Sequence, residues 1–271
     1  MMSGSTGRFA NKVAMVTGGA SGIGLAILHG LHREGASIVC ADVNQERLDV
    51  VARGFEARVA CTMADVTKEA EVEAIMGLAV ERFGRLDCAF NVAGASQPGY
   101  IVDLSETDWD FTVDLCLKGV FLCTKHAARR MLGQDGGAII NIASLNAHVP
   151  MHAGAAYASA KAGVEMLTKN AALELTPDGI RVNAVLPGLV ETPLTRRHFE
   201  NRDAHAAFLA RIPAGRAAQP EDIAGPALFL ASDEAGYVSG ASLLVDGAWA
   251  VTGYPDMRPF RGAPAWSPRS L

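Results

Sequence analysis

Three side chains between residues 144 and 161 have the types and the spacing for proton transfer at an alcohol or a carbonyl group. Tyr157 and Lys161 lie four residues apart, so on a helix they occupy one face, a turn from each other. An ordinary tyrosine hydroxyl, with a pKa of about 10, is a poor base at neutral pH. A neighbouring ammonium favours its ionised form. Ser144, on the loop before this helix, can donate a hydrogen bond to a substrate oxygen beside Tyr157.

A structural interpretation of the same three residues is also open. A Tyr-x-x-x-Lys pair occurs by chance on many amphipathic helices, and a serine in a loop is commonplace. The three side chains can exchange protons, whereas the hydrogen that leaves carbon needs a different acceptor. The catalytic interpretation therefore requires a cofactor site elsewhere in the chain.

The composition favours a protein that acts on a small molecule. With 271 residues and a hydrophobic fraction of 49%, the chain can form one large α/β domain with a substantial core. The formal net charge is −5 and the Lys and Arg residues are scattered, so we expect no nucleic-acid partner. The chain has no signal-peptide core and no apolar run of about eighteen residues, so we expect no membrane association and a cytoplasmic location.

The cysteines do not indicate a disulfide framework or a metal site. There are five of them, and none forms a Cys-x-x-Cys motif. Cys40, Cys61 and Cys88 fall in apolar, strand-like runs. We interpret them as small buried hydrophobic residues in a reducing compartment, and we expect no metal.

Apolar β-branched runs alternate with helical patterns along most of the chain. The expected strands are 12–17, 37–42, 58–62, 86–91, 137–143, 180–186 and 242–246. The expected helices follow the glycine-rich turn and cover 45–56, 68–82, a long segment near 107–132, 154–176 and 220–231. This alternation predicts a single-domain, Rossmann-like, doubly wound parallel sheet of about seven strands with helices on both faces. We expect this domain to span 11–251, after a flexible segment 1–10 and before a carboxyl-terminal extension 252–271.

A glycine-rich turn follows the first expected strand and opens a helix. Gly18, Gly22 and Gly24 have no Cβ atoms, so the backbone can turn tightly and approach a pyrophosphate at the helix N-terminus. Such a turn is a weak signal by itself, because glycine also ends strands. Its position between a strand and a helix, with an acidic residue at the end of the next strand, predicts a dinucleotide site.

Asp42 is that acidic residue. Its carboxylate can accept hydrogen bonds from the adenosine ribose and would repel a 2′-phosphate. The nearest guanidinium is that of Arg47, which we expect to point along its helix. NAD is therefore favoured over NADP. The alternative is that Asp42 is an ordinary polar residue at the end of a strand.

With these residues assembled, the sequence resembles the short-chain dehydrogenase/reductase family over about residues 11–248. The matching segments are the turn from Thr17 to Gly24, the ADV segment with Asp65, Asn91-Val92-Ala93-Gly94, the Ser144, Tyr157 and Lys161 set, and Pro187-Gly188 with Thr192. Val92 stands where the family more often has a second asparagine. The resemblance implies that the cofactor is contacted by Gly18, Ser21, Gly22, Ile23, Gly24, Asp42, Asp65, Val66, Asn91, Ala93, Gly94, Tyr157, Lys161, Pro187, Gly188, Val190 and Thr192.

The resemblance also implies a mechanism. Lys161 would bind the nicotinamide ribose and favour the Tyr157 phenolate, and Tyr157 would take the alcohol proton while hydride passes to NAD. Ser144 would hold the substrate oxygen. The implied function is NAD-dependent interconversion of a secondary alcohol and a ketone.

The sequence departs from the family pattern at Cys116. The family usually has an asparagine there, which bends the long helix and holds a water that relays protons to the lysine. A thiol is a weak hydrogen-bonding group and a poor substitute for an amide. Three interpretations are open: a relay through another group with activity retained, a slow or narrowly adapted enzyme, or a cofactor-binding protein with little catalysis.

The expected substrate pocket is apolar with a few polar groups. It combines the segment after the fourth strand, the loop 145–154 and a lid between Pro193 and Arg216. The candidate polar contacts are Gln97, Asn146, His148 and His152, although a loop histidine near a pocket often serves only packing. Such a pocket suits a neutral secondary alcohol or ketone, including a cyclic one.

The resemblance implies a homotetramer formed through the helices 107–132 and 154–176. The proline-containing segment 252–271 extends past the usual end of the family. It is either a disordered tail or a segment that docks across a subunit boundary near a substrate pocket.

Two other functional classes fit the fold less well. A catalytically weak NAD-binding regulatory or scaffold protein would not need Ser144, Tyr157 and Lys161 together. A sugar-nucleotide epimerase or dehydratase would need a longer carboxyl-terminal substrate domain and a different glycine spacing.

Overall fold

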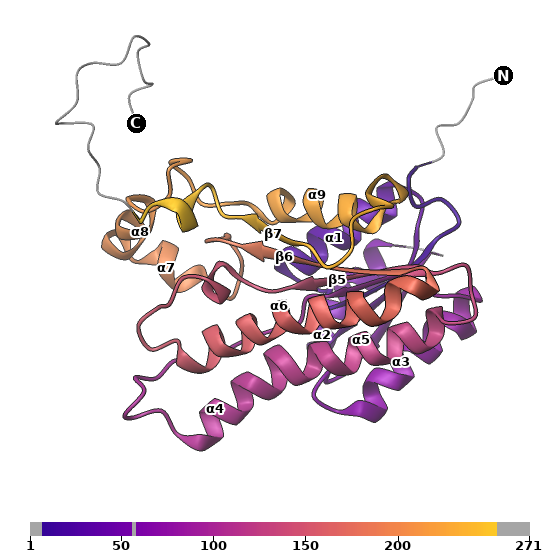
Figure 1. The fold of residues 1–271 in the computed structure, drawn as a ribbon, viewed down its shortest axis with the longest axis horizontal. Coiled ribbons are helices and arrows are strands. Elements are labelled where there is room, and N and C mark those ends of the chain that lie inside the picture. The colour runs from indigo at the N-terminus through magenta and orange to yellow at the C-terminus, as the bar shows by residue number, and fades with distance from the viewer. Residues whose placement is uncertain (1–6, 56–57, 254–271) are drawn as a thin grey trace, which may run out of the picture.

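The computed structural model describes residues 7–55 and 58–253, which build around one parallel sheet (Figure 1). Its seven strands lie in the order β3-β2-β1-β4-β5-β6-β7. The strands are β1 (Val13–Thr17), β2 (Ser37–Asp42), β3 (Val59–Met63), β4 (Cys88–Asn91), β5 (Gly137–Ile142), β6 (Ile180–Pro187) and β7 (Ser242–Val245). All six neighbouring pairs are parallel. The predicted doubly wound sheet is confirmed.

The strand order reverses between β1 and β4. From β1 the chain moves outward to β2 and β3, and it then returns to place β4 on the other side of β1. In open α/β sheets this reversal leaves a crevice at the carboxyl ends of the strands, and ligands bind there. The carboxyl ends of β1 and β4 are Thr17 and Asn91, which are register partners. The glycine-rich turn begins directly after Thr17.

The central strands are buried along their whole length because helices cover both faces of the sheet. All five residues of β1 are buried, as are all four of β4. A strand buried on both faces needs a continuous apolar run, not an alternating one, and VAMVT in β1 is such a run.

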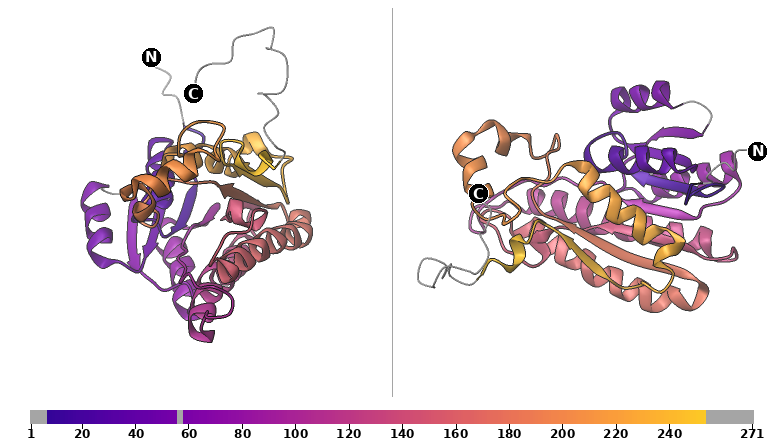
Figure 2. Two further views of the ribbon diagram at one scale, coloured as in Figure 1. Left: turned by 90° about the vertical axis from the view of Figure 1, so that its left-hand side faces the viewer. Right: turned by 90° about the horizontal axis from the view of Figure 1, so that it is seen from above.

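The helices divide between the two faces of the sheet. They are α1 (Gly22–Arg33), α2 (Gln45–Gly54), α3 (Glu69–Phe83), α4 (Glu106–Val113), α5 (Gly119–Met131), α6 (Ala155–Leu175), α7 (Arg196–Glu200), α8 (Arg202–Leu209) and α9 (Pro220–Ala231). Apolar residues of α1, α2 and α9 form one core layer with one face of the strands, and those of α3, α5 and α6 form the other. Figure 2 shows α7 and α8 beside the carboxyl end of the sheet.

The long helix expected near 107–132 is interrupted. A π-helical segment, Asp114–Lys118, separates α4 from α5, and Cys116 lies within it. In a π turn each N–H bonds one residue further back than in an α-helix, so the turn is wider and side chains after it are rotated. Helical spacing in the sequence gives no signal for a single turn of this kind.

The two ends of the chain extend beyond the part that the structure describes. Most of the flexible segment expected at 1–10 and nearly all of the extension expected at 252–271 lie outside the described residues. Within the described residues, no helix is long and apolar enough to cross a membrane. The same residues contain no group of three or more His, Cys, Asp or Glu side chains that could hold a metal ion.

Candidate active site

The glycine-rich turn forms a cradle in which there is no room for Cβ atoms. Gly18 and Gly22 have positive φ angles of 62° and 51°, in the left-handed region that glycine adopts readily. A Cβ added to Gly24 would lie 2.1 Å from the carbonyl oxygen of Gly18. The hydroxyl of Thr17 accepts hydrogen bonds from the backbone N–H groups of Val92 and Ala93, which joins this turn to the end of β4. The cradle opens at the N-terminus of α1, where backbone N–H groups favour an anion.

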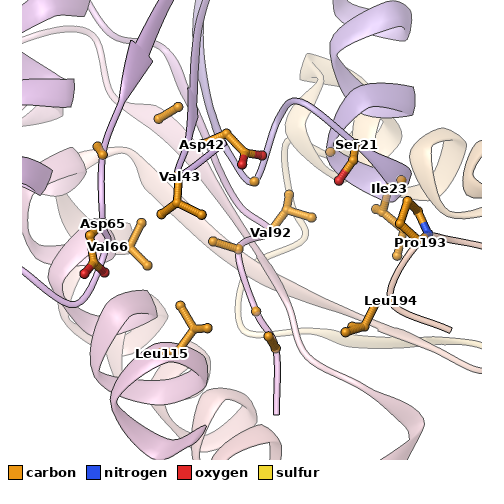
Figure 3. A pocket seen from close by; sticks show the side chains of 18 of the residues that line it. Ser21, Ile23, Asp42, Val43, Asp65, Val66, Val92, Leu115, Pro193 and Leu194 are labelled. Atoms are coloured by element: carbon orange, nitrogen blue, oxygen red, sulfur yellow. The ribbon is translucent and has the colours of Figure 1, made fainter. Parts of the chain in front are cut away.

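A cavity of about 730 Å³ extends from this cradle along the carboxyl ends of the strands (Figure 3). In Figure 3, Ser21 and Asp42 lie on one side of the cavity and Val66 and Leu115 on another. The predicted cofactor residues that line it are Gly18, Ser21, Gly22, Ile23, Gly24, Asp42, Asp65, Val66, Ala93, Gly94 and Thr192. Segments that follow β1, β2, β3, β4 and β6 thus meet at one cavity of a size suited to a small-molecule ligand.

Asp42 is held rigidly at the edge of this cavity. One carboxylate oxygen accepts a hydrogen bond from the N–H of Ala20 at 3.2 Å, and the other accepts one from the N–H of Asn44 at 3.0 Å. The lone pairs left over can accept hydrogen bonds from a ligand hydroxyl. Arg47, expected to point along its helix, instead lines the cavity with Asp42 and Val43. Arg47 lies in the first turn of α2, which begins at the expected residue 45, and this position keeps it close to the end of β2.

Asp65 is also fixed by its neighbours. Its carboxylate accepts hydrogen bonds from the backbone N–H and the hydroxyl of Thr67, and Lys68 lies 3.7 Å away. Burial opposes ionisation of this carboxyl, but the hydrogen bonds from Thr67 and the charge of Lys68 together lower the pKa of Asp65. Asp65 is therefore an ionised acceptor near neutral pH.

Ser144, Tyr157 and Lys161 lie near the other end of this region. Ser144 follows β5 and is buried, and Tyr157 is half-buried in the first turn of α6. The Lys161 ammonium is 3% exposed and donates a hydrogen bond to the carbonyl oxygen of Ile142 at 2.7 Å. It also lies 5.7 Å from the centre of the Tyr157 ring. Its one recorded acceptor among the described residues is a neutral carbonyl, so its positive charge is available to Tyr157 and to a ligand.

The Cys116 sulfur and the Lys161 nitrogen both lie close to Gly94. A Cβ on Gly94 would lie 3.5 Å from the Cys116 sulfur and 3.6 Å from the Lys161 nitrogen. The Cys116 thiol is buried and donates a hydrogen bond to the carbonyl oxygen of Ala95 at 3.1 Å. The thiol therefore holds the backbone segment that follows Gly94, which lines the cavity.

Other predicted cofactor residues do not line the cavity. They are Asn91, Tyr157, Lys161, Pro187, Gly188 and Val190. Asn91 is 1% exposed and turns into the protein, where its amide donates to Thr124 at 3.2 Å and to Asn141 at 2.8 Å. Asn141 in turn donates to Thr168 at 2.9 Å. This buried chain of polar groups ties β4 and β5 to α5 and α6.

Pro187, Gly188 and Val190 carry the chain from β6 toward Thr192. Pro187 pairs with Val245 of β7, and the N–H of Gly188 donates to the Val245 carbonyl. Val190 is buried and bridges to Ala218. These residues fix the backbone from which Thr192 reaches the cavity, where a Cβ on Gly22 would lie 3.1 Å from the Thr192 methyl group.

The four predicted substrate residues differ in whether their side chains contact other residues of the protein. The Asn146 amide donates to the carbonyl of Val149, and the imidazole of His148 is 2.6 Å from the Glu165 carboxylate. Both side chains thus stabilise the loop after Ser144. Gln97 is exposed and its backbone N–H donates to Thr112. His152 is also exposed.

Several cavity residues were not identified from the sequence. They are Ala41, Val43, Arg47, Ala64, Thr67, Val92, Ala95, Phe111, Asp114, Leu115, Pro193 and Leu194. Most of them neighbour a motif residue in the chain, so extending each motif by one or two positions would have found them. Phe111 lies in α4 and Asp114 begins the π turn, and no motif points to them.

Comparisons with known proteins identify the family. The family described as "Enoyl-(Acyl carrier protein) reductase" matches residues 18–249. A solved structure titled as a short-chain type dehydrogenase/reductase from Mycobacterium ulcerans is 32% identical, covers 93% of this chain and 94% of its own, and has a TM-score of 0.88. The chain belongs to the short-chain dehydrogenase/reductase family of oxidoreductases.

The names of individual relatives give different substrates. The cis-4-hydroxycyclohexanecarboxylate dehydrogenase of Sinomonas cyclohexanicum is 42% identical over 89% of this chain and 97% of its own length. The 3-oxoacyl-(acyl-carrier-protein) reductase of Thermotoga maritima is 38% identical over 90% of this chain and 100% of its own length. Both names describe oxidation or reduction of a small organic group. Members of this family bind a nicotinamide dinucleotide, and the Cβ-free cradle at the start of α1 fits its pyrophosphate.

Replacing Cys116 by asparagine is expected to preserve or raise kcat. An amide can donate to the Ala95 carbonyl as the thiol does, and it has a second N–H and an acceptor to spare. Turnover and melting temperature should be compared for Cys116→Asn and Cys116→Ala, because alanine removes the donor. A tenfold or larger loss in Cys116→Asn, which is about 1.4 kcal/mol in activation free energy, would show that the thiol itself is adapted to the site if folding is intact.

Proposed function

We propose that this protein is an NAD-dependent oxidoreductase that interconverts a secondary alcohol and a ketone, with Tyr157 as the acid/base. The proposal is carried by one observation: a buried Lys161 ammonium lies 5.7 Å from the Tyr157 ring, on the helix whose start adjoins Ser144 and its loop. A tyrosine hydroxyl beside an ammonium suits proton transfer at a carbinol oxygen, and this supports the proposal. We further propose that residues 11–251 form the working unit, in the cytoplasm, as a homotetramer.

A bound nicotinamide would supply the hydride acceptor for the alcohol carbon and the hydride donor for the ketone carbon. The positive charge of Lys161 stabilises the phenolate of Tyr157, which removes the hydroxyl proton in the oxidative direction. In the reductive direction the neutral Tyr157 hydroxyl returns that proton to the carbonyl oxygen. Ser144 donates a hydrogen bond to the same oxygen and orients it toward Tyr157.

The rest of the proposed cofactor site follows from the cavity. The N–H groups at the start of α1 and the turn from Gly18 to Gly24 would hold the pyrophosphate. Asp42 would accept hydrogen bonds from the adenosine ribose, and the segment with Asp65 and Val66 would contact the adenine. Ala93, Gly94 and Thr192 would bound the nicotinamide side, where Lys161 would bind the ribose hydroxyls.

We propose a neutral secondary alcohol or ketone, including a cyclic one, as the substrate. The apolar character of the segment that we propose as the lid supports a neutral substrate. In this segment, Phe199 of α7 and Phe208 of α8 pack with Leu189, Ile212 and Trp249. Gln97 and His152 are exposed side chains on the segments that would face such a substrate. The relative from Sinomonas cyclohexanicum is named for a hydroxycyclohexanecarboxylate, which is a cyclic secondary alcohol that also carries a carboxylate.

A spectrophotometric screen tests the proposal. Secondary alcohols with NAD and NADP, and ketones with NADH and NADPH, should be run beside Tyr157→Phe. We expect turnover of at least one cyclic or acyclic pair, with NAD(H) preferred. Dinucleotide binding without turnover across the screen would favour the alternative, a regulatory or scaffold protein.

Replacing Asp42 by serine is expected to lower the preference for NAD over NADP by about tenfold or more, because a hydrogen bond to a charged group contributes about 1.5–3 kcal/mol. The loss of the carboxylate also removes the repulsion of a 2′-phosphate, and Arg47 lies close enough to the cavity to attract that phosphate. The measurement is kcat/KM with each cofactor.

Asp42→Asn is the matched control for this change. It keeps one oxygen that can accept from Ala20 or Asn44, and it removes the charge together with the second acceptor oxygen. An unchanged cofactor preference in both variants would contradict the role proposed for Asp42.

A further inference from the structure

Two cysteines lie side by side on neighbouring strands next to the cofactor cavity. Cys40 of β2 and Cys61 of β3 are register partners in a parallel pair. Both side chains are on the sheet face covered by α1, α2 and α9, where Cys40 belongs to the buried core and Cys61 packs against it. Partner residues on neighbouring strands are about 5 Å apart, which lies within the Cα separations that a disulfide spans.

The two thiols differ in their surroundings. Cys40 is fully buried, whereas Cys61 is half-buried on β3, the outermost strand of the sheet. The interaction between the two neighbouring thiols lowers the pKa of Cys61 and raises that of Cys40. Cys61 is thus the thiol with more thiolate character and better access to solvent.

No other cysteine in the described residues has this arrangement. Cys88 faces Ala14 on one neighbouring strand and Ala138 on the other. Burial raises the pKa of Cys88 and that of Cys123 to about 12. All five thiols are free in this structure.

We propose that Cys40 and Cys61 form a peroxide-sensitive dithiol, which closes to a reversible disulfide and thereby weakens dinucleotide binding. The second half of this proposal rests on the proposed function. The first half concerns only the two thiols.

The chemistry has two balanced steps. The Cys61 thiolate attacks an oxygen of hydrogen peroxide, the O–O bond breaks, hydroxide leaves, and the sulfur becomes a sulfenic acid. The Cys40 sulfur then attacks the Cys61 sulfur, so that an S–S bond forms while the S–O bond breaks. Water leaves and carries away the Cys40 proton. A dithiol reductant reverses the outcome by exchange.

The link to the cofactor cavity runs through Cys40. A Cβ on Gly19 would lie 2.7 Å from the Cys40 sulfur, so this sulfur packs directly beneath the glycine-rich turn. The N–H of Gly19 donates to the carbonyl of Ala41, and Asp42 follows at the edge of the cavity. Drawing the Cys40 sulfur toward Cys61 removes the packing under Gly19 and shifts the strand end that carries Asp42.

The disulfide itself is tested without any activity assay. The reduced full chain is treated with hydrogen peroxide, free thiols are counted after unfolding, and peptides are mapped by mass spectrometry. We expect the five thiols of the reduced chain to fall by two, with a linked peptide pair containing Cys40 and Cys61 that dithiothreitol separates. In Cys61→Ser we expect peroxide to cause no paired loss of free thiols and no linked peptide. Cys123→Ala is the matched control, and we expect it still to form the link between Cys40 and Cys61. Absence of this link, or a link between other cysteines, overturns the site.

The effect on the cofactor is measured on the same samples by fluorescence titration with NADH. The dissociation constant is expected to rise by about tenfold on oxidation, the effect of losing one hydrogen bond to a charged group, and to return after reduction. Reduced Cys61→Ser should bind as the reduced wild type does and should not respond to peroxide. A linked protein with unchanged affinity overturns the coupling. If the reduced protein does not bind NADH, the proposed function is contradicted. The thiol count still tests, independently, whether Cys40 and Cys61 form a disulfide.

Discussion

Replacing Tyr157 by phenylalanine is expected to lower kcat by about 10²- to 10⁴-fold, the range that a positioned acid/base contributes. The substitution removes one hydroxyl from a half-buried ring and leaves the ring in place beside Lys161. The measurement is kcat and KM with NAD and the best alcohol from the screen. The affinity for NADH should change little, because Tyr157 does not line the cavity that we propose for the dinucleotide.

Tyr237→Phe is the matched control, since that side chain is fully exposed and far from the site in the chain. It should leave kcat and KM unchanged. Activity that survives in Tyr157→Phe would overturn the proposed mechanism. An equal loss of activity in both variants would mean that the loss is not specific to Tyr157.

Replacing Gly24 by alanine is expected to abolish measurable dinucleotide binding. The added Cβ would lie 2.1 Å from the Gly18 carbonyl, a distance at which backbone must move, and overpacking of this kind costs about 1–3 kcal/mol. The movement opens the turn between β1 and α1, so the N–H groups at the start of α1 no longer converge. NADH titration and thermal unfolding should be measured together.

Gly77→Ala in α3 is the control for this variant. A Cβ at Gly77 would meet nothing within 4 Å, and alanine in a helix interior is about 0.5–1 kcal/mol more favourable than glycine. Its binding should be unchanged and its stability equal or higher. If Gly24→Ala bound NADH like the wild type, the cradle would not be the dinucleotide site.

The sheet could be predicted because its signal is continuous in the sequence. Runs such as VAMVT in β1 are buried along their length, so burial on both faces leaves a largely apolar pattern, and β6 is buried except at the half-buried Arg181. The strand boundaries expected from the sequence agree with the structure to within two residues. The glycine-rich turn and Asp42 could be predicted for a related reason, since the turn directly follows β1 and Asp42 ends β2.

Features that depend on packing between distant segments could not be predicted. The π turn at Asp114–Lys118 leaves no trace in residue spacing, yet it sets Cys116 beside Gly94 and Lys161. The side chain of Asn91, one of the residues expected to contact the cofactor, donates to Thr124 and Asn141 inside the protein. The direction of a side chain at a strand end depends on partners that lie 33 and 50 residues away in the chain.

The most direct test of the central claim is to follow a deuterium label from the alcohol carbon. The best alcohol from the screen is prepared with deuterium on its carbinol carbon, oxidised by the enzyme in ordinary water with NAD, and the reduced cofactor is analysed by mass spectrometry. The proposed function predicts one deuterium in each reduced cofactor molecule formed, because the hydride passes from carbon to the nicotinamide while Tyr157 takes only the hydroxyl proton. Reduced cofactor without the label would contradict direct hydride transfer and the function proposed for this site.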